Sequence, residues 1–173
     1  GAQLKVAGSF LQYSSTAELN VAGNAVLQIE NGNLNLQSGM LKGSGTIVAG
    51  NVVAGKDVVI APGSSPGKLT ITGDLTLSET SVMVIECEGV SDVSKYDVVA
   101  ASKVNLNGRV HFVQYGSYSW KWHDKFEFIK TTGGVSGSFN RISVDDSRFI
   151  LTVANDGKSV AGMVFPGFNT ASV

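Results

Sequence analysis

The chain has 173 residues, of which 43% are hydrophobic and 16% charged, a composition that excludes an intrinsically disordered protein. Its 13 basic and 14 acidic side chains leave a formal net charge of -1 at pH 7, which gives no reason to expect nucleic acid as a partner. No run approaches the roughly 18 apolar residues of a membrane helix, so we expect no direct membrane insertion of this segment.

Apolar and polar residues alternate along most of the first ninety residues. The clearest apolar-polar-apolar triplets are Leu4-Lys5-Val6, Leu19-Asn20-Val21, Leu27-Gln28-Ile29, Leu34-Asn35-Leu36, Leu69-Thr70-Ile71 and Leu75-Thr76-Leu77. A helix would instead repeat its apolar residues at spacings of three and four. Since Val, Ile and Thr fill the alternating runs and Gly, Asn, Asp and Ser separate them, the sequence predicts an all-β protein.

The spacing of these strands predicts an architecture as well. From residue 17 to 86 they begin every six to eight residues, with turns of about two to five. Strands this short are typical of a parallel β-helix, a solenoid in which each coil stacks on the next, and they are too short for a β-sandwich. We therefore predict that residues 1–90 form the coils of such a solenoid.

The second half of the chain has longer strand-like runs and twelve of the fourteen aromatic residues. The segments "RVHFVQY", "DKFEFI" and "RFILTV" suggest antiparallel strands that cover the open end of a solenoid. We expect residues 91–173 to form terminal coils and an aromatic-rich β-strand cap. The two parts are expected to make one continuous domain, itself part of a larger protein or assembly.

Two prolines, each followed by glycine, precede the most regular alternation, in "APGSSPGKLTITGDLTL" at residues 61–77. Proline presets φ for a turn, and glycine leaves room where a side chain would crowd a neighbouring strand. The predicted structural turn residues are Pro62, Gly63, Pro66, Gly67 and Gly73. The alternation that follows predicts four side chains pointing into the core, namely Leu69, Ile71, Leu75 and Leu77.

Several of these segments together resemble the β-helix repeats of bacterial autotransporter passengers and related exported adhesins. The matching residues are Gly43, Gly45, Thr46 and Gly50, then Pro62, Gly63, Ser65, Pro66, Gly67, Leu69 and Gly73, then Glu86, Tyr96, Asp97 and Gly108. The resemblance implies a right-handed β-helix and a non-catalytic protein that is extracellular or at the cell surface. The family's motif residues are structural, so the resemblance assigns no ligand-binding residue.

Residue types that bind metals do not occur in this chain at metal-site spacing. His111 and His123 lie twelve residues apart without a cysteine nearby, whereas zinc needs three or four ligands. Asp145, Asp146 and Asp156 belong to turn-like segments that lack the loop spacing of calcium sites. We predict no metal and no cofactor.

The sequence gives equally little support for a catalytic nucleophile or for a catalytic acid–base pair. Glu86 and Glu88 share one strand face, whereas glycosidases place two carboxylates on opposite walls of a cleft. Ser64 and Ser65 occupy a turn that no helix follows, unlike the serine of a nucleophile elbow. Cys87 lies between strand-like residues and is expected to be a small buried hydrophobe. We predict no catalytic residue.

The remaining candidate is the aromatic segment "QYGSYSWKWHDK", which contains Tyr115, Tyr118, Trp120 and Trp122. If the segment continued a strand, Tyr118, Trp120 and Trp122 would share one face. Aromatic residues with polar tips anchor protein interfaces and stack on sugars. Three roles stay open, which are locking the cap to the solenoid, contacting another protein, and binding carbohydrate.

These observations favour a non-catalytic extracellular module, structural or adhesive, that presents a rigid contact surface to other protein chains or to copies of itself. The alternative is a subunit of an extracellular filament, joined to its neighbours by strand addition at its two termini. A polysaccharide-active β-helix enzyme is disfavoured because the 13 basic residues are scattered and no charged cluster lies on the alternating strands.

Overall fold

The computed structural model describes residues 1–146 and 148–166. Strands make up most of the regular structure of these residues, and the one helical element among them is a single 3-10 turn, Val93–Lys95. The prediction of an all-β protein is therefore confirmed. The strands are β1 (Gln3–Ala7), β2 (Phe10–Gln12), β3 (Glu18–Asn20), β4 (Val26–Glu30), β5 (Leu34–Leu36), β6 (Gly39–Gly43), β7 (Thr46–Val48), β8 (Asn51–Ala54), β9 (Val58–Pro62), β10 (Lys68–Ile71), β11 (Asp74–Leu77), β12 (Val82–Cys87), β13 (Val98–Leu106), β14 (Arg109–Gln114), β15 (Lys125–Gly137), β16 (Arg141–Val144), β17 (Phe149–Asn155) and β18 (Ser159–Pro166).

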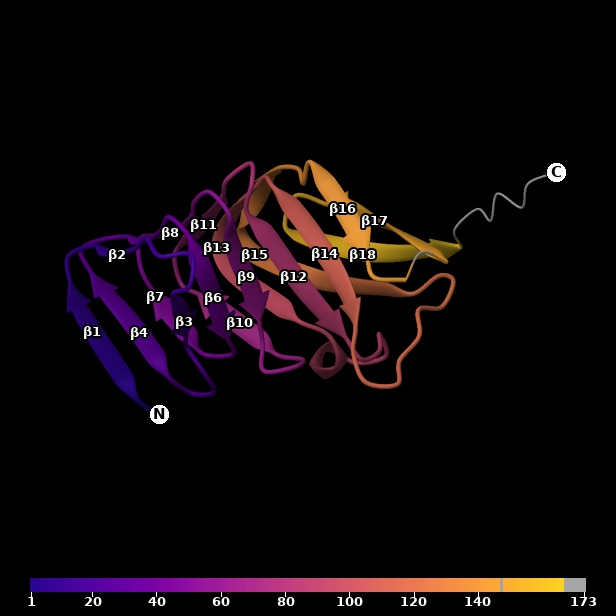
Figure 1. Ribbon diagram of the computed structural model, residues 1–173, viewed down its shortest axis with the longest axis horizontal. Helices are drawn as coiled ribbons and strands as arrows, with labels where there is room; N and C mark the ends of the chain where they lie inside the picture. The colour runs from indigo at the N-terminus through magenta and orange to yellow at the C-terminus, as the bar shows by residue number, and fades with distance from the viewer. Residues whose placement is uncertain (147, 167–173) are drawn as a thin grey trace.

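The strands assemble into a twelve-stranded and a six-stranded sheet (Figure 1). The larger sheet contains nine strands that are hydrogen-bonded in the order β1-β4-β7-β10-β13-β11-β8-β5-β2. One row of this sheet consists of β1, β4, β7 and β10, the other consists of β2, β5, β8 and β11, and β13 lies between the two rows. The smaller sheet has the order β16-β14-β12-β9-β6-β3. The ladders of β1 to β14 are parallel throughout.

One long strand joins the two rows of the larger sheet. β13 pairs with β10 through Val98 to Ala100 and with β11 through Val104 and Asn105. Its other edge pairs with β15, with a register shift after Ala101. The larger sheet therefore bends round at β13 into a nearly closed, barrel-like form, with the second sheet beside it.

The predicted right-handed parallel β-helix, with an aromatic-rich C-terminal β cap, is wrong as an account of this fold. A regular solenoid would divide each coil among separate short strands, but β13 runs for nine residues and β15 for thirteen, and each passes through both rows. Alternation along a strand specifies which face each side chain occupies, and it does not specify where a long strand joins two rows of a sheet.

The C-terminal strands pair in both directions. β14 lies parallel to β12 and to β16, so the antiparallel pairing expected for "RVHFVQY" is wrong. β17 is antiparallel to β18, and β18 in turn lies antiparallel to the first part of β15. This hairpin occupies one end of the molecule, and β1 lies at the other (Figure 1).

The inward side chains of both sheets form one core. Leu69, Ile71, Leu75 and Leu77 are all buried, which confirms their predicted orientation. Nearer the hairpin the aliphatic core gives way to aromatic rings, with Phe126 contacting Phe112 edge-on at a centroid distance of 5.5 Å and stacking on Trp120 at 5.7 Å. Such pairs add to the free energy gained by burying their area.

Candidate functional site

The proline-glycine turn lies between β9 and β10, and a buried carboxylate on a distant segment holds it. Asp97 directly precedes β13 and is 1% exposed. The backbone N–H of Gly67 donates to its Oδ1 at 2.8 Å, and the N–H of Glu86 donates to its Oδ2 at 2.9 Å. One side chain thus ties the turn to β12.

The glycines of this turn are required by close approaches. Gly63 has φ of 96° and lies against the Asp97 carboxylate, which a Cβ at this position would overlap. A Cβ on Gly67 would lie 2.8 Å from the Cα of Gly63. Pro62 is the last residue of β9, so it ends a strand instead of lying wholly between strands. These residues and Asp97 form one structural unit.

Burial raises the pKa of Asp97 to about 7, and the two backbone N–H groups that donate to it oppose this shift. The nearby carboxylate of Glu86 favours the neutral acid as well. In the sequence, Tyr96 and Asp97 are among the residues that carry the resemblance to autotransporter-type repeats. Spacing alone did not show that the acid would lie beneath the proline-glycine turn.

A hollow of about 300 Å³ with a mixed polar and apolar lining lies beside this turn, lined by Asn20, Lys42, Ala61, Pro62, Gly63, Ser64, Ser65 and Glu86. The ammonium of Lys42 is 2.9 Å from a carboxylate oxygen of Glu18. Glu88, the suggested partner of Glu86, forms an ion pair with Lys95 at 3.3 Å. The structure therefore gives Glu88 a structural contact and does not oppose the two glutamates across a cleft.

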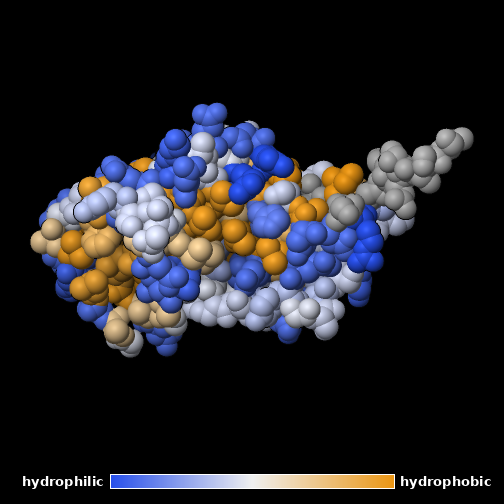
Figure 2. All heavy atoms as spheres, viewed as in Figure 1, coloured by the Kyte–Doolittle hydropathy of each residue, from blue (hydrophilic) through white to orange (hydrophobic). Residues whose placement is uncertain are grey.

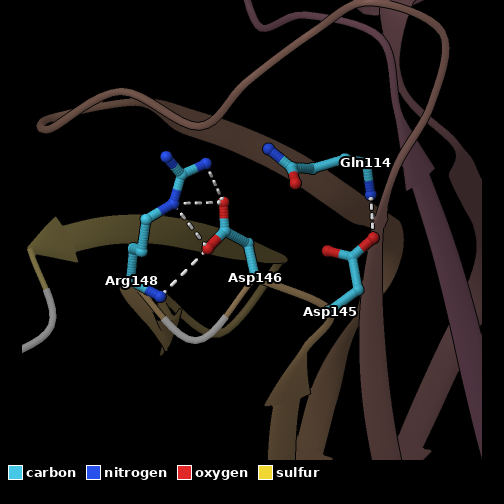
Figure 3. Close-up of polar contacts among 4 residues, drawn as sticks. All are labelled: Gln114, Asp145, Asp146 and Arg148. Carbon is cyan, nitrogen blue, oxygen red and sulfur yellow. Dashed lines mark hydrogen bonds and ion pairs between the residues drawn. The ribbon is translucent and has the colours of Figure 1, made fainter.

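The candidate metal ligands lie apart and are engaged in structural contacts. Nδ1 of His111 is 2.9 Å from the Ser143 hydroxyl, and the ring of His123 stacks on Trp122. The N–H of Gln114 donates to Asp145, while Asp146 accepts from the Arg148 guanidinium at 2.6 Å (Figure 3).

The hydrogen bonds from Arg148 hold the pKa of Asp146 below its ordinary value. Asp156 accepts from the backbone of Lys158 and Ser159 in the β17–β18 turn, and these bonds lower its pKa. Within residues 1–146 and 148–166, no three His, Cys, Asp or Glu side chains gather as metal ligands.

The aromatic segment does not continue a strand. Residues 115–124 connect β14 to β15, so the expected common face of Tyr118, Trp120 and Trp122 is wrong. Trp120 turns inward and is 2% exposed, whereas Trp122 is 61% exposed. The Tyr118 hydroxyl donates to Asp124, and burial raises the pKa of this tyrosine. Tyr118 and Trp120 secure the loop, and Trp122 and Tyr115 face solvent.

The exposed Trp122 borders an apolar groove of about 390 Å³, lined by Trp122, Ile150, Thr152, Phe165 and Pro166. The hairpin β17–β18 supplies the last four of these residues, and the loop after β14 supplies the tryptophan. The sequence pattern selected Trp122 but did not place the hairpin residues beside it, because their side chains alternate like those of any strand. Exposed aromatic and aliphatic side chains around a groove are typical of protein-contact surfaces.

Among the residues that the structure describes, none forms a helix long and apolar enough to cross a membrane. Comparison of the chain with protein-family models and with curated proteins finds no match, so the resemblance to autotransporter-type repeats stays a prediction that rests on the quoted residues.

Proposed function

We propose that this chain is a non-catalytic module of an extracellular or cell-surface protein, and that it binds another protein through the apolar groove. The observation that carries the proposal is the groove itself. Trp122, Ile150 and Phe165 are large hydrophobic side chains that are 61%, 44% and 42% exposed, and they surround one hollow of about 390 Å³. A solvent-exposed cluster of this kind is costly unless a partner covers it.

The fixed position of the loop residues next to Trp122 supports this proposal. Trp122 projects from a loop whose neighbouring residues are fixed, since Trp120 stacks on Phe126 and the N–H of Lys121 donates to Asp124 at 2.7 Å. A contact residue held in this way loses little conformational freedom when it binds. The partner that fits such a groove is a protein with an apolar side chain to insert. Carbohydrate is a weaker candidate because nearly all of the groove's lining is apolar.

A bead assay tests the proposal. Beads coated with the protein are applied to cultured cells or extracellular matrix, and the retained fraction is counted. Trp122→Ser and Phe165→Ser should weaken retention at least tenfold, roughly the effect of losing an interface anchor. Val93→Ser is the matched control because Val93 is 50% exposed and lies outside the groove. Equal retention of all variants would refute the proposal, and inhibition by soluble polysaccharide alone would identify a sugar ligand.

Self-assembly by strand addition is a second candidate, favoured by the outer edges of β1, β2 and β3, beside which no further strand of the described residues lies. Electron microscopy of the purified protein would show regular filaments if both ends joined to neighbours. Isolated particles would remove the filament alternative and leave the groove proposal untouched.

A further inference from the structure

The outer face of the six-stranded sheet is apolar at its centre. The ladders of this sheet among the described residues are all parallel, and its inward side chains belong to the core. Most outward side chains of β6, β9 and β12 are aliphatic and partly exposed, and we call these the outer patch, which consists of Met40, Val59, Ala61, Val82 and Val84. Figure 2 shows hydrophobic residues gathered in the middle of this face. Parallel sheets are typically covered on both faces, so this face fits a further layer.

Two arginines border the outer patch in register. Arg109 of β14 lies beside Val82 of β12 on one side and beside Arg141 of β16 on the other. Both arginines are exposed and belong to the outward-facing positions of their strands. Adjacent strands lie about 4.8 Å apart, and like charges directly opposite each other destabilise a sheet. The pair is therefore costly unless an anion lies between the two guanidinium groups.

No acidic side chain of the described residues neutralises this pair. Neither guanidinium has a hydrogen-bond or ion-pair partner within residues 1–146 and 148–166. The carbonyl of Glu79 accepts from the Asn140 amide at 3.0 Å, but the Glu79 carboxylate forms no ion pair with either arginine. Glu18 lies in the same row as Arg109, four strand spacings or about 19 Å away. It pairs with Lys42 at 2.9 Å, so it cannot serve the arginines.

The chemistry of this face selects a protein as its occupant. A carboxylate accepts paired hydrogen bonds from a guanidinium, so one acidic side chain placed between Arg109 and Arg141 offsets both charges. The same occupant has to cover Val82, which lies directly beside Arg109. A sugar chain would press hydroxyl groups against aliphatic side chains, where they would lose hydrogen bonds to water and gain none. A protein segment with aliphatic side chains next to its carboxylate meets both requirements.

We infer that the outer face of the six-stranded sheet binds a protein segment that places a carboxylate between Arg109 and Arg141 and aliphatic side chains on the outer patch. The ion pair between Glu18 and Lys42 bounds the patch on its other side, and its two charges already compensate each other. The apolar groove at Trp122 is built on the larger sheet, so this inference goes beyond the proposed function and does not depend on it.

Selection from a displayed library of random linear peptides, with the full chain immobilised, tests the inference. Peptides that bind the wild type should be enriched in acidic residues next to aliphatic ones. Arg109→Glu/Arg141→Glu should lower the affinity for these peptides roughly tenfold or more, because the face then repels their carboxylates, and it should select basic peptides instead. The matched control is Lys68→Glu/Lys103→Glu, which changes the net charge equally on exposed strand residues of the larger sheet.

Two further variants separate recognition from folding. Arg109→Gln/Arg141→Gln keeps long side chains and removes the like charges, so it should fold as the wild type does and still lose the acidic peptides. Val59→Thr/Val82→Thr keeps branched side chains in the outer patch and should weaken binding roughly tenfold, because it places hydroxyl groups beneath the partner. Thermal unfolding followed by circular dichroism checks that each variant is folded.

Three results would overturn the inference. The first is a selection that enriches no acidic peptides, and the second is equal affinity of the wild type and the arginine variants for the selected peptides. The third is tighter binding of the acidic polysaccharide alginate than of any selected peptide, which would identify a sugar ligand. Trp122→Ser should leave the peptide affinity unchanged. A loss in that variant would place the peptides in the apolar groove, which would contradict this inference and leave the proposed function standing.

Discussion

Replacing Asp97 with asparagine keeps the side-chain volume and removes the carboxylate that holds the turn at residues 62–67. Asparagine offers one oxygen, which can accept from either Gly67 or Glu86 but not from both, and its amide N–H₂ would face the other donor. A buried N–H without an acceptor costs about 1–3 kcal/mol. We expect Asp97→Asn to lower the free energy of unfolding by this amount at about pH 5, where the folded wild-type acid is still mostly neutral.

The effect should depend on pH in a defined direction. Burial raises the pKa of Asp97 from its ordinary 3.8 to about 7, so the folded state binds this proton more tightly than the unfolded chain. The associated stability is fully present below about pH 4 and is lost as pH rises through about 7. Between about pH 5 and about pH 8, the wild type should lose about 2–3 kcal/mol from this group, whereas Asp97→Asn should not.

Urea unfolding of both proteins at these two pH values, at equal ionic strength, measures the difference. The destabilisation caused by Asp97→Asn should shrink by about 2–3 kcal/mol at the higher pH. The control Glu79→Gln changes an exposed turn residue and should leave the free energy of unfolding unchanged at both pH values. A destabilisation that is equal at both pH values, or larger at the higher one, would contradict a pKa of Asp97 raised by burial.

Three further outcomes are expected. Gly73→Ala should lower the free energy of unfolding in urea by about 1–3 kcal/mol, since the added Cβ would overlap the Ala49 carbonyl oxygen. The control Gly50→Ala should cost much less, because the nearest atom to its added Cβ is a side-chain atom at 3.3 Å. Phe126→Ala should cost about 3–5 kcal/mol because it empties the centre of the aromatic core, and a loss below 1 kcal/mol would contradict that packing. Burial raises the pKa of Cys87 to about 12, so a thiol reagent should label it only as the protein unfolds, and rapid labelling under native conditions would contradict its burial.

The sequence predicted local structure better than it predicted the arrangement of strands. Alternation identified the inward side chains of β10 and β11 because the side-chain period of a strand is fixed by its backbone. It could not locate the join at β13, since a strand that passes from one row to the next has the same alternation as one that does not. The long run without a turn signal from Val98 to Leu106 was the one available indication.

The candidate site was predictable only in part. Trp122 was selected for its chemistry, but its exposure and the burial of Trp120 depend on the loop between β14 and β15 leaving the strand pattern. Phe165 and Ile150 join the groove through the antiparallel pairing of β17 with β18, in which they lie opposite each other. Pairing between strands is a tertiary property, and the residues carry no local mark of it.

The long strand β13 couples the two rows of the larger sheet during thermal unfolding. Its nine residues hydrogen-bond to β10 and β11 along one edge and to β15 along the other, so neither row of the larger sheet can detach without breaking ladders on both sides. Coupling of this kind makes the loss of structure all-or-none. Scanning calorimetry should therefore show one endotherm whose calorimetric and van't Hoff enthalpies agree. The N-terminal strands and the aromatic core should unfold at the same temperature.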